Sequence, residues 1–172
     1  MSTPADVITP TSFADAMADL PAGVAVITTR GPDGPMGLTV TSMGPFTAEP
    51  PSLMVSVSHG SRSCDPLLGC EQFGVHLLAR DQEQVAMAFV RKDDDKFAGL
   101  SWAWDGDVPR LDGALAYLRC HRDTAFTHHD HTLLIGAIVA IDRIADQHAA
   151  PLLYHRRKFC WSLQDDGTST GG

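Results

Sequence analysis

The stretch that decides how this chain folds is GLTVTSMGPFTAEPPSLMVSVSHGSRS, residues 37–63. Two segments within it, 37–42 and 52–58, are rich in β-branched or alternating apolar residues and are separated by turn-forming residues. This pattern predicts two consecutive strands. In the second segment Leu53, Val55 and Val57 recur at every other position, which places one apolar face toward a core.

The same stretch carries more hydroxyl groups than a surface strand needs. They belong to Thr39, Thr41, Ser42, Ser56, Ser58, Ser61 and Ser63. Short hydroxyls and the amides of tight turns can converge on a phosphate or on the edge of a polar ring. Serine and threonine are also common in turns and edge strands for purely structural reasons. The residues alone leave both roles open.

Outward from this stretch, the chain continues as short strands. Residues 23–42 predict a hairpin around the turn RGPDGP, since glycine and proline supply the backbone angles of a turn. Further strand-like runs follow at 73–79, 115–121, 131–142 and 152–155. With about seven strands and no alternation of strand and helix, a Rossmann sheet is disfavoured. We expect a mainly β domain, a small antiparallel closed barrel with peripheral helices.

Two segments have the apolar spacing of helices. SFADAMADL predicts a short helix over residues 12–20, with Thr11 or Ser12 as its N-cap. DQEQVAMAFV predicts a second helix over residues 81–90, opened by Asp81 as the N-cap of a capping box. The chain contains neither GxGxxG nor GxxxxGK[ST], so a bound nucleotide would be held without either glycine-rich motif.

Composition narrows the class of protein. At 172 residues the chain is long enough for one domain with a sizeable core. Its formal net charge of −8 argues against a nucleic-acid surface, but a small anion can still bind to backbone amides. The longest apolar run, residues 133–141, is too short for a membrane helix. The start of the chain lacks the features of a signal peptide.

The four cysteines have no CxxC pair and no zinc-like spacing, which favours free thiols in a reducing compartment. We therefore expect a cytoplasmic protein with no membrane or nucleic-acid partner. By composition we expect a flexible arm at residues 1–10, a folded domain at 11–163 and a disordered tail at 164–172.

Several short segments, in order along the chain, resemble the flavin reductase family, the FMN- or FAD-using partners of two-component monooxygenases. They are PAGVAVITTR (21–30), GLTVTS (37–42), AEPPSLMVSV (48–57), SRS (61–63), DKFAGL (95–100), LDGALAYLRC (111–120), DHT (130–132) and PLLYHR (151–156). Each segment is weak evidence by itself, whereas their common order is specific. The resemblance implies an FMN-binding split β-barrel over nearly all of the folded chain.

The resemblance also implies a flavin site. The ring edge and ribityl chain would be held by hydroxyls and amides of Thr39, Val40, Thr41, Ser42, Ser56, Val57 and Ser58. The phosphate would lie near Ser61 and Ser63, where a short helix begins and its N-terminus favours an anion. Lys96 would approach the phosphate, and Phe97 would cover the ring or pack in the core.

The segment THHDHT (127–132) is a second candidate site. Three histidines and an aspartate could suggest a metal, but they lie in an expected turn with no second ligand cluster, so we expect no metal. The resemblance gives His131 the role of orienting the nicotinamide. The chain departs from the family pattern at His129, where glycine is usual and would permit a positive φ. It also departs at His76, where asparagine is frequent.

The function implied by the resemblance is that of an NAD(P)H:flavin oxidoreductase. Hydride would pass from the nicotinamide to FMN or FAD, and the protein would contribute orientation and proximity rather than a nucleophile. A homodimer and a partner oxygenase that receives reduced flavin are also implied. The long strand-like run 131–142 is apolar on both faces, which a two-fold partner would cover.

The sequence leaves other functions open. Enzymes such as pyridoxamine-phosphate-type oxidases and deazaflavin-dependent reductases share this barrel, and a flavin- or haem-binding module would need no turnover. Sequence does not decide between FMN and FAD. It favours NADH over NADPH only in that no basic cluster stands out as a site for a 2′-phosphate.

Overall fold

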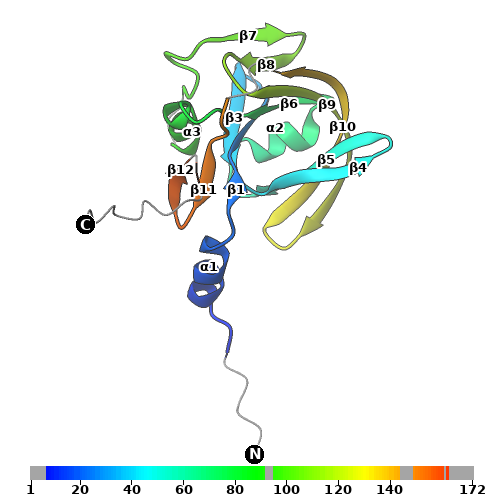
Figure 1. The fold of residues 1–172 in the computed structure, drawn as a ribbon. Coiled ribbons are helices and arrows are strands. Elements are labelled where there is room, and N and C mark those ends of the chain that lie inside the picture. Colours follow the sequence, from blue (N-terminus) through cyan, green and yellow to red (C-terminus); the bar gives the residue numbers. More distant parts are fainter. Residues whose placement is uncertain (1–6, 92–94, 144–148, 161, 163–172) are drawn as a thin grey trace, which may run out of the picture.

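A curved seven-stranded antiparallel sheet forms the body of the molecule in the computed structural model, which describes residues 7–91, 95–143, 149–160 and 162. Its strand order is β3-β2-β6-β9-β10-β5-β4. The strands are β2 (Ala25–Arg30), β3 (Pro35–Val40), β4 (Met43–Ala48), β5 (Pro51–Ser58), β6 (Gln72–Leu77), β9 (Ala116–His128) and β10 (His131–Arg143). Figure 1 shows how this sheet wraps around a short helix.

The sheet curls until its first edge, β3, approaches β5. The amide of Ser56 donates to the carbonyl of Ser42, the residue before β4, at 2.9 Å, which extends the pairing of β4 with β5. Among the described residues, no hydrogen-bonded ladder pairs β3 with β5. The barrel is therefore split rather than closed. The mainly β split-barrel class expected from the sequence is confirmed, and the expectation of full closure is corrected.

Smaller elements surround this sheet. A three-stranded sheet contains β1 (Ala22–Gly23), β11 (Leu153–His155) and β12 (Lys158–Cys160), and a hairpin pairs β7 (Trp102–Asp105) with β8 (Val108–Leu111). The helices are α1 (Pro10–Ala18), α2 (Cys64–Gly69) and α3 (Glu83–Val90). In Figure 1, α2 lies within the curve of the main sheet, α3 lies beside β11 and β12, and α1 projects from the body.

Two apolar clusters hold these layers together. The first fills the curve of the sheet and joins α2 to the strands through Ile27, Val55, Val57, Leu67 and Phe73. The second lies between the sheet, α3 and the small strands, and includes Val26, Phe89, Phe97, Leu111 and Leu152. Fully burying one such large side chain stabilises the fold by about 1.5–3 kcal/mol. Among the helices of the described residues, none is long and apolar enough to cross a membrane.

The hairpin over residues 23–42 and the alternation in 52–58 are confirmed. β2 pairs with β3 in an antiparallel register that sets Ala25 opposite Val40. In β5, Leu53, Val55 and Val57 are buried and their neighbours from Met54 onward are half-buried.

The starts of both expected helices are wrong. α1 begins at Pro10 because Thr9 is the N-cap: its hydroxyl accepts the amide of Ser12, and the Ser12 hydroxyl accepts the amide of Thr9. The predicted cap at Thr11 or Ser12 lies inside this helix. Its apolar face is exposed at Phe13 and Met17. Residues 1–6 of the expected arm and the whole expected tail, 164–172, lie outside the described residues.

The second helix begins at Glu83 rather than after Asp81. Gln82 takes the N-cap position without a side-chain cap bond. Its amide side chain instead accepts from the Ala79 amide at 3.0 Å and donates to the Asp112 carbonyl at 3.1 Å. These contacts fix the chain before the helix and displace the capping box that the local pattern predicts.

Candidate functional site

A groove runs along β3 where α3 and the segments after β5 and β11 pack beside it. It consists of two cavities of about 620 Å³ and about 580 Å³, and both are lined by Thr39 and Val90. Pockets for small organic ligands and cofactors commonly have volumes of about 300–1,000 Å³. The groove is therefore large enough for a mononucleotide, with room for part of a second ligand.

The first cavity is the cationic end of the groove. Its basic residues are Arg62, Arg91 and Lys96, and Ser61 lies beside them. The Lys96 ammonium donates to the Phe89 carbonyl at 2.9 Å and lies 3.4 Å from the Gly37 carbonyl, so it is anchored at the cavity wall. Basic side chains with a hydroxyl and turn amides can bind a phosphate group.

The second cavity is lined by Thr39, Val40 and Thr41 on one side and by apolar residues of α3 on the other. β3 is an edge strand of the main sheet, so its outer backbone groups have no partner strand in that sheet. The Thr39 hydroxyl donates to the Ala86 carbonyl at 2.6 Å and retains acceptor capacity. The main-chain groups of an edge strand beside an apolar wall suit the polar edge of a flat aromatic ring.

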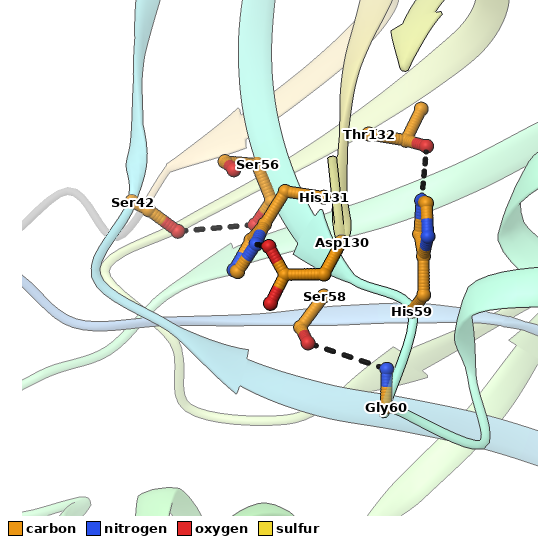
Figure 2. A network of polar contacts seen from close by, with 8 residues as sticks. All are labelled: Ser42, Ser56, Ser58, His59, Gly60, Asp130, His131 and Thr132. Atoms are coloured by element: carbon orange, nitrogen blue, oxygen red, sulfur yellow. Dashed lines mark hydrogen bonds and ion pairs between the residues drawn. The ribbon is translucent and has the colours of Figure 1, made fainter. Parts of the chain in front are cut away.

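A second group of predicted residues lies on the outer face of the β5–β10 ladder. His131 is opposite Ser58, and Leu133 is opposite Ser56, so the side chains of His131, Ser58 and Ser56 share one face. The Ser42 hydroxyl donates to the Ser56 carbonyl at 3.0 Å (Figure 2). The Ser58 hydroxyl accepts the Gly60 amide at 3.2 Å. The Ser42 hydroxyl ties the connection between β3 and β4 to β5, and the Ser58 hydroxyl holds the turn that leads to the cationic end of the groove.

His131 begins β10 and is half-exposed. Its Nδ1 lies 2.9 Å from the Asp130 carboxylate, and this contact, drawn in Figure 2, lowers the pKa of Asp130. Next to it, His59 Nε2 lies 2.9 Å from the Thr132 hydroxyl. Neither cavity of the groove is lined by His131. The carboxylate orients the imidazole at the surface beside the serine-bearing face.

The turn before His131 is shorter than expected. Residues 127 and 128 belong to β9, and only His129 and Asp130 connect the two strands. His129 has a φ of 50°, in the left-handed region that favours glycine. His129 therefore adopts the backbone conformation that glycine would favour at this position, and it adds an imidazole side chain there. Among the described residues, no group of three His, Cys, Asp or Glu side chains could hold a metal ion.

Four predicted site residues have buried side chains. Val40 and Val57 lie in the first apolar cluster, and Phe97 packs in the second, edge-on to Phe89 at 4.9 Å and to Trp102 at 5.1 Å. The Ser63 hydroxyl donates to the Gly37 carbonyl at 3.0 Å. Their interior positions leave at most their main-chain groups to face a ligand. For Phe97 the core-packing alternative is the one that the structure favours.

His76 is also an interior residue. Its Nε2 accepts the Leu111 amide at 3.0 Å, so Nδ1 carries the proton and donates to the Val26 carbonyl at 3.1 Å. The ring stacks on Tyr117 with centroids 4.9 Å apart. Burial lowers the pKa of His76 to about 4. This departure from the family pattern is thus a neutral core histidine with both nitrogens satisfied.

Sequence reasoning missed several residues that line the groove. At the cationic end these are Arg62 and Arg91, and at the far end they are Arg157 and Lys158. Arg62 stands in the segment SRS, where a basic residue between two serines could have drawn attention. No local pattern marks Arg91 or the pair at 157–158, because the groove joins segments that are far apart in sequence.

Comparison with known proteins identifies a family for this chain. The model of the flavin reductase like domain matches residues 17–162. A protein of Rhodococcus qingshengii named NADH:FMN oxidoreductase is 37% identical over 143 residues, which cover 81% of this chain and 74% of that protein.

Solved structures show the same fold. The flavin reductase SMOB of the styrene monooxygenase from Pseudomonas putida S12 has a TM-score of 0.79 at 28% identity, covering 86% of this chain and 95% of that one. The NADH:FAD oxidoreductase SgcE6 of Streptomyces globisporus has a TM-score of 0.84 at 25% identity, and the match covers 94% of this chain and 99% of that one. The family resemblance drawn from the sequence is confirmed: this chain belongs to the flavin reductase like domain family.

Proposed function

We propose that this protein is an NADH:flavin oxidoreductase that reduces FMN or FAD and supplies the reduced flavin to a partner oxygenase. The observation that carries the proposal is the groove along β3, which has an edge strand on one side and three basic residues at one end. It supports a flavin because that ligand needs amide contacts for its ring and an anion site for its phosphate.

Within this proposal, Thr39, Val40 and Thr41 hold the ring along the edge strand. Ser61 and Lys96 bind the phosphate. Ser42, Ser56 and Ser58 fix the connecting backbone through the hydrogen bonds described above. Bound flavin supplies the hydride acceptor. The chain supplies proximity and orientation, which can be worth about 7–11 kcal/mol in favourable cases.

The activity is tested by mixing the purified protein with NADH and either FMN or FAD while following absorbance at 340 nm. We expect flavin-dependent oxidation of NADH with both flavins, and slower oxidation of NADPH. A protein that binds flavin tightly but consumes no NADH would be a binding module instead. Absence of both binding and turnover would exclude the proposed function.

His131 is proposed to position the nicotinamide. We expect His131→Ala to raise the KM for NADH several-fold, by losing one polar contact of about 1 kcal/mol, while the Kd for FMN stays constant. His128→Ala is the matched control, because His128 is exposed and faces His131 across the same turn. Equal KM values for NADH in the His131 variant and the wild type would remove His131 from the site.

A homodimer is proposed on the evidence of β10. Val139 and Ile141 in this strand are 52% and 58% exposed, an apolar surface that a second copy would cover. Light scattering of the purified protein should give about twice the chain mass of 18.5 kDa. A mass equal to that of one chain at micromolar concentration would contradict the dimer.

A further inference from the structure

The turn between β11 and β12 is built from two arginines in a conformation that arginine disfavours. His155 pairs with Lys158, so Arg156 and Arg157 form a two-residue hairpin loop. Their φ angles are 49° and 62°. Two-residue hairpin loops with positive φ strongly prefer Asn-Gly or Gly-Gly. Non-glycine residues in this region persist where other contacts hold them, and they are frequent at ligand sites.

The two arginines differ in where they lie. Arg157, with Lys158 and the rings of Tyr154 and Phe159, lines the far end of the groove, whereas Arg156 does not. Arg157 is held by an ion pair with Asp15 of α1. Arg156 has a separate partner, Asp19, at 3.1 Å. Both guanidinium groups therefore pair with acidic residues of α1 or its C-cap, but only Arg157 also lines the groove.

The groove therefore has a cationic group at each end. Arg62, Arg91 and Lys96 lie at one end, and Arg157 and Lys158 lie at the other, with Thr39 and Val90 common to both cavities. Glu83 is the acidic residue among the lining of the far cavity, and Asp15 pairs with Arg157 from α1. FMN has one phosphate, which the first end accommodates. The second end is suited to a further phosphate-bearing ligand.

We propose that Arg157, assisted by Lys158, binds the diphosphate of NADH, since the diphosphate of FAD includes the flavin phosphate and so belongs at the opposite end of the groove. The proposal rests on the proposed function. A guanidinium can bind phosphate oxygens through two parallel hydrogen bonds, and the exposed pair with Asp15 is weak enough to be exchanged for them. The apolar residues Met87, Phe159 and Tyr154 would lie against the bases.

The test is Arg157→Gly, which supplies the residue that the turn prefers and removes the guanidinium. KM values for NADH, FAD and FMN are measured for this variant, for the wild type and for Arg156→Gly. Arg156→Gly is the matched control because it makes the same change one residue earlier, outside the lining of the groove. A thermal midpoint within about 3 °C of the wild type shows that each variant is folded.

For Arg157→Gly we expect a rise of about 10-fold in the KM for NADH, with kcat nearly unchanged and the KM values for FMN and FAD unchanged. A rise for NADH in assays with FMN supports the assignment of this end to the nicotinamide nucleotide, and a rise for FAD alone overturns it. Arg157→Lys should recover most of the affinity.

Unchanged KM values in Arg157→Gly, or equal increases in Arg156→Gly, overturn the proposal while the wild type remains active. Lack of NADH oxidation by the wild type is a different outcome, because it contradicts the proposed function itself.

Discussion

Lowering the pH from 7 to about 4 is expected to reduce the free energy of unfolding by about 3 kcal/mol through one side chain, His76. Its imidazole is fully buried, and burial lowers its pKa from 6.5 to about 4, with a smaller contribution from the nearby Arg110. Protonation would also place a second N–H where Nε2 now accepts the Leu111 amide.

The direction in which the free energy of unfolding changes with pH follows from the number of protons that each state binds. Between pH 6.5 and about pH 4 the unfolded chain carries the proton on His76 and the folded chain does not. The unfolded state then binds more protons, so stability falls as the pH falls through this window and is fully present above it. Each unit of pKa difference corresponds to about 1.4 kcal/mol.

The measurement is urea unfolding at pH 7 and at pH 4, followed by tryptophan fluorescence. His76→Asn should lower stability at pH 7 and should remove the pH-dependent loss that His76 causes. His121→Asn, at a half-exposed histidine, should keep the wild-type dependence. If His76→Asn and the wild type lose equal stability between the two pH values, His76 does not control acid sensitivity.

Replacing Ser61 by alanine is expected to weaken the binding of FMN by about 10- to 100-fold, the loss of one charge-assisted hydrogen bond worth about 1.5–3 kcal/mol. Ser61 lies at the cationic end of the groove, with Arg62 and Lys96. Its hydroxyl accepts the Ser63 amide at 3.2 Å, which leaves its proton available to a phosphate oxygen.

Riboflavin lacks the phosphate, so its binding distinguishes the loss of a phosphate contact from a general loss of structure. Fluorescence titration should show weaker FMN binding to Ser61→Ala and unchanged riboflavin binding. Ser101→Ala is the control, because the Ser101 hydroxyl donates to Asp112 outside the groove lining. Parallel losses for FMN and riboflavin would place the phosphate elsewhere.

The parts of the fold that the sequence predicted are those set by local periodicity. The alternation in residues 52–58 identifies β5, because apolar residues recur at every second position in a strand that is buried on one face. The start of α1 is set locally by the reciprocal bonds of Thr9 and Ser12, whereas the start of α3 was missed because it depends on a distant partner. Gln82 is held by Asp112, thirty positions away, and this contact has no signature in the local pattern.

The candidate site was predicted in part for a related reason. Hydroxyls cluster within residues 37–63, so Thr39 and Ser61 could be singled out and do line the groove. Burial depends on the whole fold, so the interior positions of Ser63 and Phe97 could not be read from their neighbours. Arg157 was missed because only the three-dimensional arrangement brings β12 beside β3 and α3.

The most direct test of the central claim is a crystal structure of the protein with FMN bound. The flavin ring should lie along Thr39, Val40 and Thr41, with its phosphate at Ser61 and Lys96. Flavin bound away from β3, with the groove closed by protein side chains, would contradict the account.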